Sequence, residues 1–150
     1  MSEPQHTPAK DISIRGAGLH TGQPSTMRVL PAPADCGIVF IRTDLPHRPA
    51  VPASVSCAVD TSVGRRTVLA KDGVEVQTVE HFMAALWGAG IDNAYVEVSA
   101  PELPGLDGSA QPFLDQVQEA GLTEQPTPRR RFEVREPIVV EDGESCVAVF

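Results

Sequence analysis

The sequence predicts an α+β fold, in which a two-layer domain with a mainly antiparallel sheet packed against two helices is followed by the start of a second domain. Short apolar runs separated by glycine- and proline-containing turns are typical of strands. Two stretches carry apolar residues at helical spacing. Asp-Gly pairs at residues 72–73 and 142–143 stand between apolar runs, which indicates two antiparallel hairpins.

Four segments have strand patterns outside these hairpins. Residues 12–14 open the first strand, and residues 27–31 alternate apolar with polar side chains, as in a strand with one buried face. Residues 37–42 form a continuous apolar run, typical of a more buried strand. Residues 93–99 alternate again. The glycine-rich residues 16–22 lack the spacing of a phosphate-binding loop, so we interpret them as a turn between strands.

The first helix is predicted to follow residue 78. Thr78 is expected to cap its N-terminus with the hydroxyl, and Glu80 lies in the first turn, where the helix dipole favours an anion. Gly88 and Gly90 are expected to end it. Its apolar stripe, with spacing i, i+3, i+4 and i+7, consists of Val79, Phe82, Met83 and Leu86.

The second helix is predicted between residues 109 and 121. Ser109 is the expected cap, and Pro112 falls in the first turn, where no backbone N–H is needed. Gly121 is expected to end the helix. Its buried face consists of Phe113, Leu114 and Val117.

These elements divide the chain into four parts. Residues 1–11 are polar and contain prolines, so we expect a flexible N-terminus. Residues 12–124 form the α+β domain, and residues 125–131 have the composition of a linker. Residues 132–150 contain the initial strands of an incomplete second domain, expected at Phe132–Val134, Ile138–Val140 and Cys146–Val149.

Composition excludes several classes of protein. The 150 residues include 12 Lys and Arg against 20 Asp and Glu, a formal net charge of −8, which disfavours nucleic acid as a partner. The N-terminus has no apolar signal region, and the longest apolar stretch, residues 82–91, is about half of the ~20 residues that a membrane span needs. We therefore expect a cytoplasmic protein without a transmembrane segment.

Few residues could carry chemistry. Glu80 and His81 are adjacent at a helix N-terminus, where a carboxylate beside an imidazole can serve a metal site or can simply be a helix-start acid and a hydrogen-bonded histidine. His20 lies in the glycine-rich loop, which can present it to a cleft. Asp107 and Ser109 are interpreted as an Asp turn and a helix cap. The chain contains no His-x-x-x-Asp.

Several motifs occur here in a characteristic order. They are Gly16-Ala-Gly-Leu-His-Thr-Gly22, Thr78-Val-Glu-His-Phe-Met-Ala-Ala-Leu86, Gly90-Ile-Asp-Asn93 and Pro104-Gly-Leu-Asp-Gly-Ser-Ala110. Over about residues 12–150 the chain resembles the N-terminal half of UDP-3-O-acyl-N-acetylglucosamine deacetylase. That family comprises the zinc enzymes of lipid A biosynthesis in Gram-negative bacteria.

The resemblance implies two similar α+β domains, with their helices between the sheets and the active site between the domains. It implies that His81 is a ligand of Zn²⁺ and that Glu80 is the general base for the attacking water. It also implies that His20 approaches the substrate, UDP-3-O-acyl-N-acetylglucosamine. The reaction would release acetate.

The chain departs from the family pattern in what it lacks. In the family, a C-terminal half supplies the remaining zinc ligands, on a His-x-x-x-Asp helix, and a general-acid histidine. Gly105 also stands where we expect a bulkier apolar residue. The alternative hypothesis is therefore a non-catalytic truncated fragment or binding module that retains the N-terminal fold.

Overall fold

The main sheet has five strands in the order β2-β3-β9-β4-β5. The structure, a computed structural model, describes residues 3–59 and 64–150. Strands β4 and β9 are parallel, and the other neighbours pair antiparallel. The mainly antiparallel sheet is therefore confirmed. Its strands are β2 (Ile12–Ala17), β3 (Pro24–Pro31), β4 (Ile38–Arg42), β5 (Ala50–Pro52) and β9 (Ala94–Val98).

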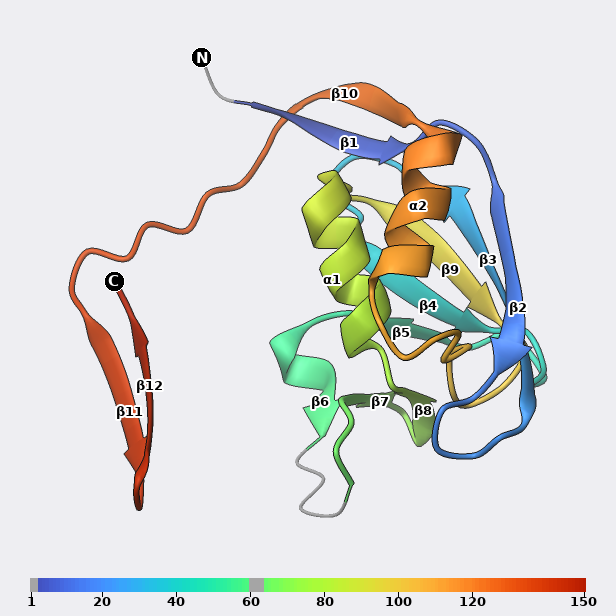
Figure 1. The fold of residues 1–150 in the computed structure, drawn as a ribbon. Coiled ribbons are helices and arrows are strands. Elements are labelled where there is room, and N and C mark those ends of the chain that lie inside the picture. The colour runs from blue at the N-terminus through green and yellow to red at the C-terminus, as the bar shows by residue number, and fades with distance from the viewer. Residues whose placement is uncertain (1–2, 60–63) are drawn as a thin grey trace.

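Two helices, α1 (Glu80–Ala89) and α2 (Gln111–Ala120), lie side by side over one face of this sheet (Figure 1). Each turns an apolar stripe inward, because side chains three and four residues apart share one face of a helix. The two-layer α+β prediction and most of the predicted helix faces are confirmed. The buried helix residues are Phe82, Ala85, Leu86, Phe113, Val117 and Ala120.

A second, three-stranded sheet lies below α1 (Figure 1). It consists of β6 (Ala58–Val59), β7 (Val68–Lys71) and β8 (Val74–Gln77), and the 3₁₀-helix η1 (Val55–Cys57) leads into it. The first predicted hairpin is confirmed, since Asp72 and Gly73 join β7 to β8 with φ angles of 51° and 79°. Positive φ at both turn residues suits the twist of the two strands.

The N-terminus differs from the prediction. We expected residues 1–11 to be flexible, but β1 (Pro4–Pro8) pairs antiparallel with β10 (Leu122–Pro128), and part of the expected linker 125–131 belongs to β10. The sequence analysis missed these strands because proline lacks the N–H that pairs strands in a sheet, so its presence argues against a strand. Proline is nevertheless tolerated at a sheet edge.

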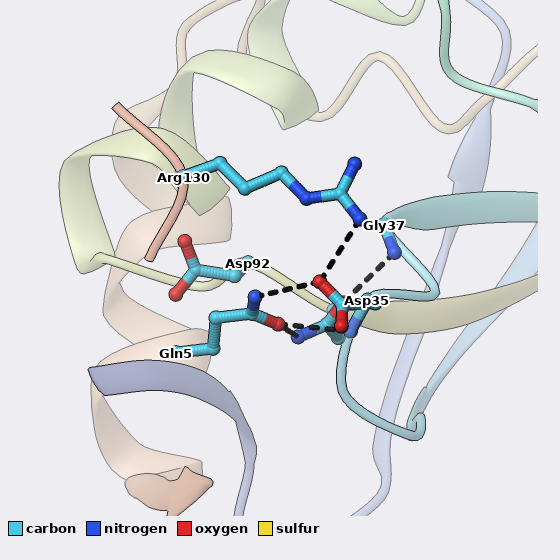
Figure 2. A pocket seen from close by; sticks show the side chains of 6 residues that line it. Gln5, Asp35, Gly37, Asp92 and Arg130 are labelled. Carbon is cyan, nitrogen blue, oxygen red and sulfur yellow. Dashed lines mark hydrogen bonds and ion pairs between the residues drawn. The ribbon is translucent and has the colours of Figure 1, made fainter. Parts of the chain in front are cut away.

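Buried polar side chains hold β1 in place. The Gln5 amide donates to Asp35 Oδ1 at 3.0 Å and to the carbonyl of Pro128 at 3.1 Å. Its carbonyl oxygen accepts from the backbone N–H of Asp35 and from Asn93 Nδ2 (Figure 2). Gln5 is 4% exposed, so this network compensates for the loss of water around a polar side chain.

The predicted helix caps also differ. Val79 occupies the N-cap position of α1 without a side-chain hydrogen bond, and Thr78 has φ 57°. Thr78 therefore does not cap the helix, and its hydroxyl donates to Glu102 instead. Ser109 lies one residue before the N-cap of α2, and its hydroxyl accepts the N–H of Gln111 at 3.2 Å.

The ends of the helices follow the prediction more closely. Gly90, with φ 79°, ends α1, whereas Gly88 lies inside the helix. Pro112 falls in the first turn of α2, and Gly121 follows its last residue.

The C-terminal segment forms one hairpin rather than three strands. β11 (Ile138–Asp142) pairs antiparallel with β12 (Ser145–Val149), which confirms the second predicted hairpin. Phe132–Val134 is not a strand; Phe132 is 86% exposed. Among the described residues, no strand pairs with this segment.

No helix in the described part of the chain combines the length and apolar character needed to cross a membrane.

Candidate functional site

Glu80 and His81 form the first turn of α1. Consecutive helical residues point about 100° apart, so the two side chains face different neighbours. Glu80 Oε2 accepts a hydrogen bond from the backbone N–H of Thr67 at 3.0 Å. This bond orients the carboxylate toward the residue that directly precedes β7. Both side chains are half-buried, and the helix dipole favours the negative charge at position 80.

An apolar hollow opens beside Glu80. Val55, Leu69, Val79 and Met83 are among the residues that line it together with Glu80. The carboxylate therefore borders a surface that can take an apolar group.

The loop before α2 carries a carboxylate, Asp107, that interacts electrostatically with His81. The backbone N–H and the hydroxyl of Ser109 each donate to Asp107 Oδ1 at 2.9 Å. These hydrogen bonds hold the pKa of the Asp107 carboxyl below its ordinary value, and the charge of the nearby His81 contributes in the same direction. The predicted Asp turn is confirmed. The sequence did not indicate the electrostatic interaction between this carboxylate and His81.

His20 lies in the exposed loop that joins β2 to β3, as predicted for a turn between strands. Its backbone N–H donates to Glu102 Oε1 at 2.9 Å. The structure therefore connects the His20 loop to the segment before α1 through Glu102, because Thr78 donates to the same oxygen.

Glu102 was not among the residues singled out from the sequence. It is 1% exposed and accepts four hydrogen bonds, from the N–H groups of His20 and Thr21 and from the hydroxyls of Thr21 and Thr78. Burial acts to raise the pKa of this carboxyl, but the hydrogen bonds from Thr21, His20 and Thr78 outweigh it and lower the pKa to about 2. A lone Glu in a proline-rich loop carries no sequence signal for this role.

Acid is expected to weaken the fold through Glu102. Its pKa is about 2 in the folded chain against 4.5 ordinarily, so its stabilising contribution is complete above about pH 4.5 and is lost as the pH falls toward 2. The contribution corresponds to about 3 kcal/mol. Urea unfolding at pH 7, 4 and 3 should show the stability of Glu102→Gln converging on that of the wild type. A constant difference across these pH values would contradict the assignment.

The described residues contain no group of three or more His, Cys, Asp or Glu side chains placed to hold a metal ion. His81 is the one predicted ligand within them. A complete catalytic zinc site usually uses three protein ligands.

A separate polar pocket lies between β1 and the chain after β10, lined by Gln5, Asp35, Asp92, Asn93 and Arg130 among others (Figure 2). Its polar groups bind one another: Arg130 pairs with Asp35 at 3.2 Å, and Asn93 donates to Gln5. These pairings give the pocket a structural role in fastening the two ends of the domain.

Known proteins resemble this chain along almost all of its length. The profile of the UDP-3-O-acyl N-acetylglycosamine deacetylase family matches residues 5–150. The UDP-3-O-acyl-N-acetylglucosamine deacetylase of Myxococcus xanthus is 48% identical over 140 residues, 93% of this chain and 44% of the relative. That of Saccharophagus degradans is 46% identical over 144 residues, 96% of this chain and 47% of the relative.

The Shewanella oneidensis protein of the same name is 43% identical over 141 residues, 93% of this chain and 45% of the relative. The chain thus spans about half the length of the curated relatives it matches. The matched region includes α1 with its Glu80–His81 pair and the loop that carries Glu102. The chain belongs to the UDP-3-O-acyl N-acetylglycosamine deacetylase family.

Proposed function

We propose that this chain is the N-terminal part of a zinc-dependent deacetylase that acts in the cytoplasm on UDP-3-O-acyl-N-acetylglucosamine in lipid A biosynthesis. The observation that carries the proposal is the placement of Glu80 and His81 on the first turn of α1, inside a region that matches the family from residue 5 to 150. We infer the substrate from the names of the relatives.

The donor set fits part of a zinc site. His81 is a half-buried imidazole on the first turn of α1, and imidazole nitrogen is a common ligand of zinc. We propose that the remaining ligands, a His and an Asp on a His-x-x-x-Asp segment, come from a C-terminal part together with a general-acid histidine. When bound, zinc would polarise the substrate carbonyl and make water more acidic.

The residues of this chain then have distinct tasks. Glu80 takes the proton from the attacking water, and the N–H of Thr67 holds one carboxylate oxygen so that the other can accept it. His20, on its exposed loop, contacts the substrate. The apolar hollow beside Glu80 is compatible with a substrate that carries an acyl chain.

The full-length protein, meaning these residues together with the C-terminal part that the relatives possess, tests the proposal. Purified with zinc, it should release acetate from UDP-3-O-acyl-N-acetylglucosamine, lose this activity on chelation and regain it when zinc is restored. Residues 1–150 alone should bind zinc weakly and release no acetate, because one imidazole leaves most of the coordination shell to water. A full-length protein that is active without any metal would refute the proposal. Stoichiometric nanomolar zinc binding by residues 1–150 would show that the C-terminal ligands are not needed.

A further inference from the structure

Glu102 joins two segments that are far apart in the sequence. Its Oε1 accepts the N–H of His20 at 2.9 Å and the hydroxyl of Thr78 at 2.8 Å. Its Oε2 accepts the N–H and the hydroxyl of Thr21, at 2.9 and 2.7 Å. Both carboxylate oxygens are therefore used, and the two segments meet at a single buried group.

The loop closes tightly around this carboxylate. A Cβ atom at Gly18 would lie 2.2 Å from Glu102 Oε2, so only glycine permits the approach. A Cβ at Gly105 would lie 2.9 Å from that of Leu19, which explains the glycine where we expected a bulkier residue. The backbone N–H of Gly105 also donates to Ala17 at 2.8 Å. The His20 loop thus rests directly on the Glu102 segment.

Thr78 is the link from Glu102 to α1. Its φ of 57° is unfavourable for a β-branched residue, and two hydrogen bonds hold it there: its N–H donates to the Thr67 carbonyl and its hydroxyl to Glu102. Thr67 in turn donates its own N–H to Glu80. The direction in which the chain enters α1, and with it the position of Glu80, depends on these contacts.

We propose that Glu102 is a positioning residue of the catalytic site, which fixes the His20 loop and the first turn of α1 relative to each other through Thr78. The inference rests on the proposed function. A buried carboxylate is costly to desolvate, and here hydrogen bonds from four donors compensate for that cost. What the carboxylate provides is simultaneous hydrogen bonding to two loops.

Thr78→Val tests this link, because valine keeps the shape of threonine and removes the hydroxyl, whereas Thr78→Ser keeps the hydroxyl. In the zinc-loaded full-length protein, Thr78→Val should lower kcat about 10- to 100-fold with zinc content retained. Thr78→Ser, which keeps the hydroxyl, should have the kcat of the wild type. Val117→Ala, a buried change in α2 that removes none of these hydrogen bonds, should lower the melting temperature and leave kcat unchanged.

A second readout does not depend on activity. In residues 1–150, Thr78→Val should shift the imidazole NMR signals of His81 and speed the hydrogen exchange of the His20 amide, and Thr78→Ser should do neither. If Thr78→Val fails to fold, Glu102→Gln takes its place, because the Gln amide cannot accept all four hydrogen bonds. Unchanged His81 signals together with a wild-type kcat would overturn the positioning role. A wild-type protein that releases no acetate would instead refute the proposed function, and the NMR signals would still decide the role of Glu102.

Discussion

Replacing Glu80 by Gln should lower the turnover of the zinc-loaded full-length protein by about 10²–10⁴-fold, the usual contribution of a positioned general base. Glutamine keeps the size of the side chain and can still accept the Thr67 N–H, so the local structure should persist. It cannot take a proton from water. Zinc content, measured by elemental analysis, should stay at the wild-type level while the rate of acetate release falls.

His81→Ala is the matched comparison. If His81 is a ligand, this change should remove zinc and activity together, whereas Glu80→Gln removes activity alone. The competing explanation is that Glu80 only stabilises the N-terminus of α1, a contribution of about 0.3–1 kcal/mol. Near-normal turnover of Glu80→Gln with zinc retained would establish that explanation and exclude the general base.

Phe82→Ala should destabilise the fold of residues 1–150 by about 3–5 kcal/mol. Phe82 is fully buried and makes edge-to-face contacts with Phe40 of β4 and Phe113 of α2, at ring-centroid distances of 6.3 and 5.6 Å. It therefore connects the sheet to both helices, and its removal leaves a cavity at their junction. Urea unfolding followed by far-ultraviolet circular dichroism measures the loss.

Trp87→Ala provides the control on the same helix. Trp87 is 85% exposed in residues 1–150, so its truncation should change stability by no more than about 0.5 kcal/mol. If Phe82→Ala costs no more than Trp87→Ala, the aromatic contacts do not hold the two layers together.

Local periodicity predicted the core well. The alternation in residues 93–99 places Ala94, Val96 and Val98 on the buried face of β9, each with 0% exposure. The helical spacing likewise identified Phe82 and Leu86 on α1. These patterns are readable because side-chain direction repeats every 2 residues in a strand and every 3.6 in a helix, whatever the rest of the chain does.

Polar residues were among those that the sequence analysis misjudged. Residues 1–11 were predicted to be flexible, yet Gln5 is buried and accepts a hydrogen bond from Asn93, 88 residues away. Thr78 was predicted to cap α1, and it binds Glu102 instead. In both cases the local sequence is compatible with the predicted structure and with the observed one. Which of the two forms depends on a hydrogen-bond partner far away in the sequence.

The sequence by itself thus determined the fold class, the two helix faces and the hairpin turns, and its motifs indicated the family that the profile match confirms. It also placed Glu80 and His81 together, since adjacent residues at a helix start need no tertiary information. Only the tertiary structure decided that His20, 82 residues from Glu102, shares a carboxylate with Thr78. The physical reason is that periodicity encodes which side of an element is apolar, whereas the partner of a buried polar group depends on which loops the fold brings together.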